Sequence, residues 1–248
     1  MFYSLEKTQI TLLMKTLTLL FVSLLTSVTT FAQISESEKQ TLLDLYHSTN
    51  GSSWNTSWNL EAPVTTWHGV TIHENKVVAI DLGFNNLTGT IPASIGNLSH
   101  LESLKLFFNQ IEGTLPSEIG NLTQLKVLDL NSNNLIGEIP SSIGNLSNLN
   151  TLLLSSNQLS GMLPKELSLL TNLTSLVVFD NQLSGNIPLS YNQLKNMSEL
   201  VIAENNFSNT NLYIPTEMLT SVGTPMIFNE IKTFDNTEIS TIVLDEDN

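Results

Sequence analysis

Residues 125–148 read LKVLDLNSNNLIGEIPSSIGNLSN, and the same 24-residue pattern recurs without a shift from residue 77 to residue 196. Its copies begin at residues 77, 101, 125, 149 and 173, and a sixth begins at Met197 and loses the pattern after Phe207. A fixed period of this length indicates a stack of similar structural units rather than a globular domain built around one pocket. Any binding surface is then expected to extend over several units.

Four apolar positions recur in every copy and predict the core. In the quoted copy they are Leu125, Leu128, Leu130 and Leu135. The spacing of two between Leu128 and Leu130 is typical of a short strand whose alternate residues face inward. One unit cannot bury these side chains alone, so we expect neighbouring units to bury them against each other.

Each copy then carries an asparagine, a glycine and a proline, which are Asn133, Gly137 and Pro140 in the quoted copy. A side-chain amide can satisfy backbone groups where the chain leaves a strand, and a column of amides can bond from unit to unit. Glycine permits a left-handed backbone, and proline ends strand pairing because it has no N–H donor. We therefore interpret the asparagine column as scaffold.

The motif L-x-x-L-x-L-x-x-N-x-L followed by x-G-x-I-P-x-x-I-G-N-L resembles the leucine-rich repeat in its plant-type 24-residue subclass. Receptor-kinase ectodomains and polygalacturonase-inhibitor-like proteins carry that form. The resemblance covers residues 77–207, as five full repeats and one partial repeat. It implies an α/β repeat fold, a right-handed leucine-rich-repeat solenoid with a concave parallel β-sheet and an N-terminal helical cap. Such proteins usually bind proteins, peptides or glycans on the concave face.

The first 32 residues predict a secretory signal peptide. Met14-Lys15 precedes an apolar run over residues 17–28, and Ala32 offers a small residue for cleavage. We expect the true start at Met14 and no membrane insertion after cleavage. The protein is then secreted or held at the cell surface.

Residues 33–76 predict the N-terminal cap. Ser35 and Glu38 have the spacing of a capping box that begins a helix, and Asn50-Gly51 ends it. Three tryptophans follow and are interpreted as cap core: Trp54, Trp58 and Trp67. The sequence resembles the cap of plant-type repeat proteins without its usual cysteines, and this favours a bacterial exported homologue in the cell envelope.

Residues 208–248 predict a C-terminal cap and an acidic tail that ends in LDEDN. The whole chain holds 9 Lys and Arg, all of them lysine, against 23 Asp and Glu, for a formal net charge of −14. Nucleic-acid binding is disfavoured because it needs clustered cations. Binding to anionic lipid headgroups is disfavoured for the same reason.

Catalytic groupings are lacking in the sequence. The four histidines His47, His68, His73 and His100 do not share a column, and no G-x-S-x-G turn is present. Asp81, Lys105 and Asp129 do share one, at a carboxylate separation near the upper limit for a glycosidase, about 5–10 Å. The favoured interpretation is an exposed ion-pair ladder. We expect a protein that is not an enzyme and holds no metal or cofactor.

Strand residues that face away from the core form the candidate binding surface. Exposed apolar side chains on such a surface mark contact sites, although Phe84 and Phe108 could instead fold sideways over the turn for packing. The polar members could supply hydrogen bonds. The candidate ligand-binding residues are Phe84, Lys105, Phe107, Phe108, Asp129, Asn131, Leu153, Ser155, Val177 and Phe179.

Two functions follow from this surface. The first is a non-catalytic recognition module that binds an extracellular protein, peptide or glycan. The second is a structural or adhesive envelope protein whose repeats act as a spacer or self-associate. Ice binding needs a regular threonine array, and the column after the glycine is irregular: Thr90, Thr114, Glu138, Met162, Asn186. The oligomeric state and the identity of the ligand stay open.

Overall fold

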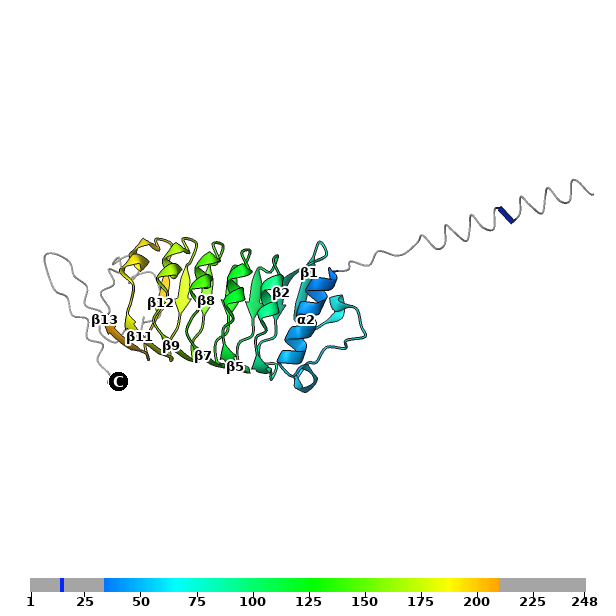
Figure 1. Ribbon diagram of the computed structural model, residues 1–248, viewed down its shortest axis with the longest axis horizontal. Helices are drawn as coiled ribbons and strands as arrows, with labels where there is room; N and C mark the ends of the chain where they lie inside the picture. Colours follow the sequence, from blue (N-terminus) through cyan, green and yellow to red (C-terminus); the bar gives the residue numbers. More distant parts are fainter. Residues whose placement is uncertain (1–13, 16–33, 210–248) are drawn as a thin grey trace, which may run out of the picture. The chain divides into compact units, whose positions relative to one another are not determined.

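The computed structural model describes residues 14–15 and 34–209 (Figure 1). The chain divides into two compact units, residues 1–33 and 34–248, and the fold below is that of the described part of the second. Met14 and Lys15 are helical. The rest of the expected signal peptide lies outside the described residues, and so does nearly all of the expected C-terminal cap and tail, from residue 210 onward.

A seven-stranded sheet, the concave sheet of the solenoid, holds one strand from the cap, β1, and one strand from each of the six repeats. Its order is β1-β2-β4-β6-β8-β10-β12, and all pairs are parallel except β1 with β2. The bounds are β1 Val70–His73, β2 Lys76–Asp81, β4 Ser103–Lys105, β6 Val127–Asp129, β8 Thr151–Leu153, β10 Ser175–Val177 and β12 Glu199–Val201. Lys105 pairs with Asp81 on one side and Asp129 on the other, so neighbours differ by one 24-residue period, as the sequence predicts.

A second, six-stranded parallel sheet runs along the coils in the order β13-β11-β9-β7-β5-β3, and the sequence analysis did not predict it. The bounds are β3 Thr88–Thr90, β5 Gln110–Thr114, β7 Asn134–Gly137, β9 Gln158–Gly161, β11 Gln182–Asn186 and β13 Asn206–Asn209. Thr88 pairs with Gln110, so neighbours here are 22 residues apart rather than 24. The two sheets therefore follow the same repeat with different registers.

Each repeat returns through one short 3-10 helix that follows its proline. These are η3 Ala93–Asn97, η4 Ser117–Asn121, η5 Ser141–Asn145, η6 Lys165–Leu169 and η7 Leu189–Gln193. Successive coils approach closely there, since a Cβ on Gly120 would lie 2.4 Å from the Ser142 carbonyl oxygen. Figure 1 shows these helices in a row beside the strands of the concave sheet.

The apolar columns form one continuous core. Leu125, Leu128, Leu130 and Leu135 are each 0% exposed, and their equivalents in the other repeats are buried with them, except Phe207, which is partly buried. Burial of a leucine side chain contributes about 1.5–3 kcal/mol. Because each coil buries its leucines against the next, the free energy of folding resides mainly between repeats.

The asparagine column forms a hydrogen-bond ladder through this core, as the sequence predicts. The Asn133 amide donates to the carbonyl oxygens of Leu130, in its own repeat, and Leu106, in the preceding repeat. Its Oδ1 accepts from the Ile111 N–H at 3.0 Å. From Asn109 onward each amide of the column thus satisfies backbone groups of two coils at once, whereas the first, Asn85, bonds to Thr56 of the cap.

The cap begins with α2 Glu36–Ser48 and continues with the 3-10 helices η1 Gly51–Ser53 and η2 Val64–Thr66. Ser35 and Glu38 form the expected capping box, and α2 stops just before Asn50, which has φ 55°. The tryptophans are buried, and Trp58 stacks on Trp67 with centroids 4.7 Å apart. They cover the open end of the repeat core, which confirms their interpretation as cap core.

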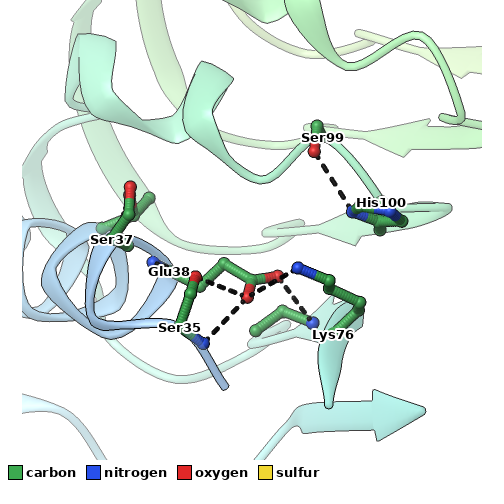
Figure 2. Close-up of polar contacts among 8 residues, drawn as sticks. Ser35, Ser37, Glu38, Lys76, Ser99 and His100 are labelled. Carbon is green, nitrogen blue, oxygen red and sulfur yellow. Dashed lines mark hydrogen bonds and ion pairs between the residues drawn. The ribbon is translucent and has the colours of Figure 1, made fainter. Parts of the chain in front are cut away.

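The Glu38 carboxylate also links the cap to β2, the strand of the first repeat (Figure 2). Its carboxylate accepts hydrogen bonds from Ser35 N–H, Ser35 Oγ and Val77 N–H, and its Oε2 lies 3.8 Å from Lys76 Nζ. The residue is only 4% exposed, so these contacts offset the cost of burying its charge. The chain has no cysteine, so no disulfide can join the cap to the repeats. The Glu38 carboxylate links α2 to β2 instead.

Candidate functional site

The outward face of the concave sheet carries all ten predicted site residues, and none of them is buried. The strand register places Lys105, Asp129, Leu153 and Val177 in one row. A second row follows at the strand ends, where Phe108 N–H donates to the Asn131 carbonyl and the neighbouring coils repeat this bond. The structure therefore brings the predicted residues onto one continuous surface.

Three phenylalanines at the cap end of this surface form one cluster, the Phe cluster, which consists of Phe84, Phe107 and Phe108. Phe84 stacks on Phe108 with centroids 4.5 Å apart and planes 9° apart. Phe107 meets Phe84 edge-on, at 5.2 Å and 85°. Phe84 and Phe108 remain 62% and 53% exposed. Both rings therefore lie outside the core and pack on each other over the turns.

The backbone at Phe84 and Phe108 is left-handed, with φ 55° and 51°. This conformation costs an L-residue about 1–2 kcal/mol and is uncommon for a bulky side chain. The equivalent residues of the later repeats are polar and have the same conformation: Ser132, Ser156, Asp180 and Glu204. Neither burial nor backbone preference accounts for phenylalanine at the first two positions.

The ring of Phe107 occupies space that is free because Gly83, in the preceding repeat, has no side chain. A Cβ on Gly83 would lie 2.5 Å from the Cε1 and Cζ atoms of the Phe107 ring. Gly83 occupies the position equivalent to Phe107 one repeat earlier. The glycine thus leaves room for the ring, which in turn supports Phe84.

The expected Asp81–Lys105–Asp129 ladder is only half formed. Lys105 Nζ lies 3.7 Å from Asp81 Oδ2, with both side chains exposed. No ion pair joins Lys105 to Asp129 in the described part of the chain. Asp129 Oδ1 instead accepts a hydrogen bond from the Asn131 N–H at 3.2 Å. The ladder prediction is therefore corrected to one ion pair beside one separate carboxylate.

Burial raises the pKa of the Asp129 carboxyl above its ordinary value. The hydrogen bond from Asn131 and the charge of Lys105 lower that pKa, but they do not outweigh desolvation, to which the Asp81 charge adds. The Asp129 carboxylate therefore lacks full compensation in the unbound protein. A cationic group placed beside it would lower its pKa again.

The polar middle of the surface differs from expectation at Ser155. Its Oγ is shielded from solvent and has no hydrogen-bond partner among residues 34–209. Its backbone N–H donates to Asn131 Oδ1 at 2.6 Å. Ser155 therefore positions the half-buried Asn131 side chain through its backbone N–H and does not present its own hydroxyl.

The far end of the surface combines half-buried aliphatic side chains with carboxylates. Leu153, Val177 and Val201 are paired across β8, β10 and β12. Beside them lie three exposed acids, Asp180, Glu199 and Glu204. Glu199 Oε2 accepts from Ser175 Oγ at 2.5 Å, which orients that carboxylate. The acids were not among the predicted site residues, although the sequence columns place them there.

A separate groove of about 660 Å³ lies between the second sheet and the 3-10 helices. It is lined in part by Glu138, Met162, Lys165 and Glu166, and Met162 is 66% exposed. None of the predicted site residues borders it. Among the described residues, no three His, Cys, Asp or Glu side chains are grouped to hold a metal ion. No helix within residues 14–15 and 34–209 has the length and apolarity to cross a membrane.

A family model described as "Leucine-rich repeat region" matches residues 75–238. The chain belongs to the leucine-rich repeat family. Its repeats are of the plant type, in agreement with the relatives that it resembles.

Among curated proteins, the chain is 37% identical over 93 residues to the Arabidopsis thaliana LRR receptor-like serine/threonine-protein kinase EFR. The match covers 34% of this chain and 9% of that protein, so the chain spans a small part of its curated relative. The crystal structure of the LRR ectodomain of the receptor kinase SOBIR1 from Arabidopsis thaliana has a TM-score of 0.61 at 30% identity. The match covers 71% of this chain and 97% of the SOBIR1 ectodomain chain.

A second similar structure is the LRR ectodomain of the plant membrane receptor kinase GASSHO1/SCHENGEN3 from Arabidopsis thaliana, in complex with CASPARIAN STRIP INTEGRITY FACTOR 2. Its TM-score is 0.58 at 32% identity, with 68% of this chain and 21% of that chain covered. These leucine-rich repeat structures and the strands of Figure 1 confirm the predicted fold class. They do not test which residues of this repeat protein bind a ligand.

Proposed function

We propose that this leucine-rich repeat protein is a non-catalytic recognition module outside the cytoplasm, which binds a protein, peptide or glycan on its concave sheet. The observation that carries the proposal is the exposed stack of Phe84 on Phe108. Exposed aromatic side chains that contact each other mark interaction sites more often than scattered ones do. A partner that covers the rings would gain the free energy of burying their apolar area.

The left-handed backbone strengthens this argument. Ser132 and Ser156 occupy the same conformation in later repeats, so serine is compatible with the scaffold at these positions. Phenylalanine there adds exposed apolar surface without filling the core. A binding role explains both features at once. The similar GASSHO1/SCHENGEN3 ectodomain, solved in complex with CASPARIAN STRIP INTEGRITY FACTOR 2, supports recognition as the type of function.

We also propose that the protein is an exported homologue, secreted or held at the cell surface. The apolar segment over residues 17–28 and Ala32 support a cleaved signal peptide. The cap lacks the cysteines of plant relatives, and this supports a bacterial envelope as the location. Amino-terminal sequencing of the exported protein tests this proposal, and we expect its first residue to be Gln33.

The binding proposal is tested with a random 12-residue peptide library in mRNA display and with a glycan array. The F84S/F108S variant replaces both exposed rings by serine, the residue that two other repeats carry at this position. The control is M162S, which removes an exposed apolar side chain directly after β9 of the second sheet, away from the concave sheet. We expect ligands selected by the wild type to bind M162S and not F84S/F108S. Equal binding to all three proteins would refute the concave-sheet proposal.

The alternative is a structural or adhesive protein that self-associates. Sedimentation equilibrium of the mature chain over a hundredfold concentration range separates the two functions. A monomer at all concentrations favours recognition of another molecule. Concentration-dependent assembly that F84S/F108S abolishes would assign the Phe cluster to self-association instead.

A further inference from the structure

We propose that the partner is a cationic peptide segment that lies across the strands, with an apolar residue over the Phe cluster and a Lys or Arg at the Asp180–Glu199–Glu204 end. This inference rests on the proposed function and specifies the chemistry of its ligand. It follows from how charge and apolar surface are distributed over the concave sheet.

The outward positions of the concave sheet carry five carboxylates and one lysine. The acids are Asp81, Asp129, Asp180, Glu199 and Glu204, and the lysine is Lys105, which is already paired with Asp81. The sheet thus presents a surplus of negative charge to any partner. Like charges across an interface are unfavourable and opposite charges are favourable, so a peptide of positive charge is selected over an acidic one.

Three of these acids, Asp180, Glu199 and Glu204, lie at the end of the sheet opposite the rings. The Phe cluster belongs to the turns after β2 and β4, whereas Glu199 begins β12 and Glu204 follows it. Four strand spacings of about 4.8 Å separate β4 from β12, or about 19 Å. An extended peptide advances about 3.3 Å per residue, so about six residues join an apolar anchor to its cation.

Asp129 lies between the two ends in the row of Lys105 and Leu153. Because Asp129 forms no ion pair with Lys105 within residues 34–209, its carboxylate can pair with a cation of the peptide. The Asn131 amide beside it can accept or donate a hydrogen bond to the peptide backbone. The middle of the path is therefore polar, and the half-buried Leu153 and Val177 line its floor.

The test uses the mRNA-display library of 12-residue peptides on the wild-type protein and on D180N/E199Q/E204Q. These changes keep size and hydrogen-bonding oxygens and remove three charges. The control E112Q/E138Q/E166Q removes three charges away from the concave sheet. We expect wild-type peptides to be enriched at least twofold in Lys and Arg, and to bind the first variant about tenfold more weakly. Their affinity for the control stays within twofold.

Each other outcome has a defined meaning. Selected peptides that need Phe84 and Phe108 but are neutral or acidic overturn the cationic ligand and leave the proposed function intact. Cationic peptides that bind D180N/E199Q/E204Q as tightly as the wild type overturn the assigned charge contacts. Peptides that bind F84S/F108S unchanged overturn both proposals. If no peptide is selected, the peptide inference is wrong and the glycan array alone decides the function.

Discussion

The ring of Phe84 lies parallel to the ring of Phe108, 4.5 Å away in the next repeat. Both residues have a left-handed backbone, and both rings are more than half exposed. Stacking of this kind contributes about 0.5–1.5 kcal/mol beyond area burial. That gain is small for two large side chains, and it leaves most of their apolar surface for a partner.

The first prediction concerns the stability of F84S/F108S. Because the rings contact mainly each other and Phe107, we expect the free energy of unfolding to fall by less than about 2 kcal/mol. Leu106→Ala, one residue before Phe107 and 0% exposed, should cost about 2–5 kcal/mol. Urea denaturation followed by circular dichroism measures both. A loss in F84S/F108S as large as that in Leu106→Ala would mean that the rings serve packing.

The second prediction concerns the asparagine ladder. Asn133→Ala leaves the buried Ile111 N–H without its side-chain acceptor and removes one of the two amide donors to the Leu106 carbonyl, which keeps Asn109. We expect a loss of about 1–3 kcal/mol, the cost of one unsatisfied buried group. The adjacent and exposed Asn134 supplies the control, and Asn134→Ala should change stability by less than about 0.5 kcal/mol. Equal effects of the two changes would contradict the ladder.

The third prediction concerns the link between cap and repeats. Glu38→Ala removes the capping-box carboxylate, the acceptor of Val77 N–H and the partner of Lys76. We expect a loss of about 2–4 kcal/mol and faster hydrogen exchange at Val77. Glu36→Ala changes an exposed acid in the same helical turn and should cost less than about 1 kcal/mol. Unchanged exchange at Val77 in Glu38→Ala would show that the cap is held by its tryptophans alone.

The fourth prediction concerns pH. The pKa of Asp129 in the folded protein is raised above its ordinary value, so ionisation of this carboxyl disfavours the folded state. The protonated carboxyl therefore favours the folded state, and this stabilisation is lost as pH rises from the ordinary pKa of 3.8 through the raised folded-state pKa. Asp129→Asn should accordingly be more stabilising, relative to wild type, at pH 7 than at pH 3. Denaturant midpoints at the two pH values check this, and a gain that is larger at pH 3 would have the wrong sign.

The 24-residue period predicts the concave sheet residue by residue, because its strands follow the period without offset. The strand register places Lys105 beside Asp81 on one side and Asp129 on the other, and the asparagines bridge neighbouring coils. The second sheet was missed because glycine and proline there suggested a loop. Its register is 22 residues, two fewer than the sequence period. Thr90 therefore pairs with Glu112 and not with Thr114, so a column read at period 24 does not describe this sheet.

The candidate surface could be predicted in position but not in conformation. Nothing in the residue types at Phe84 and Phe108 indicates a left-handed backbone, because neither is glycine or asparagine. The identity of the equivalent residues as Ser, Ser, Asp and Glu was the available signal. The inward hydroxyl of Ser155 and the single ion pair of Lys105 depend on side-chain rotamers, which the repeat pattern does not encode.

The most direct test of the account is hydroxyl-radical footprinting of the mature protein with and without a library-selected peptide. Oxidation rates at Phe84 and Phe108 report on the concave sheet, and the rate at Met162, which directly follows β9 of the second sheet, is the internal control. We expect the peptide to slow oxidation of both phenylalanines at least threefold and to leave Met162 unchanged. Protection of Met162 with unchanged rates at Phe84 and Phe108 would place the binding surface on the other sheet and contradict the account.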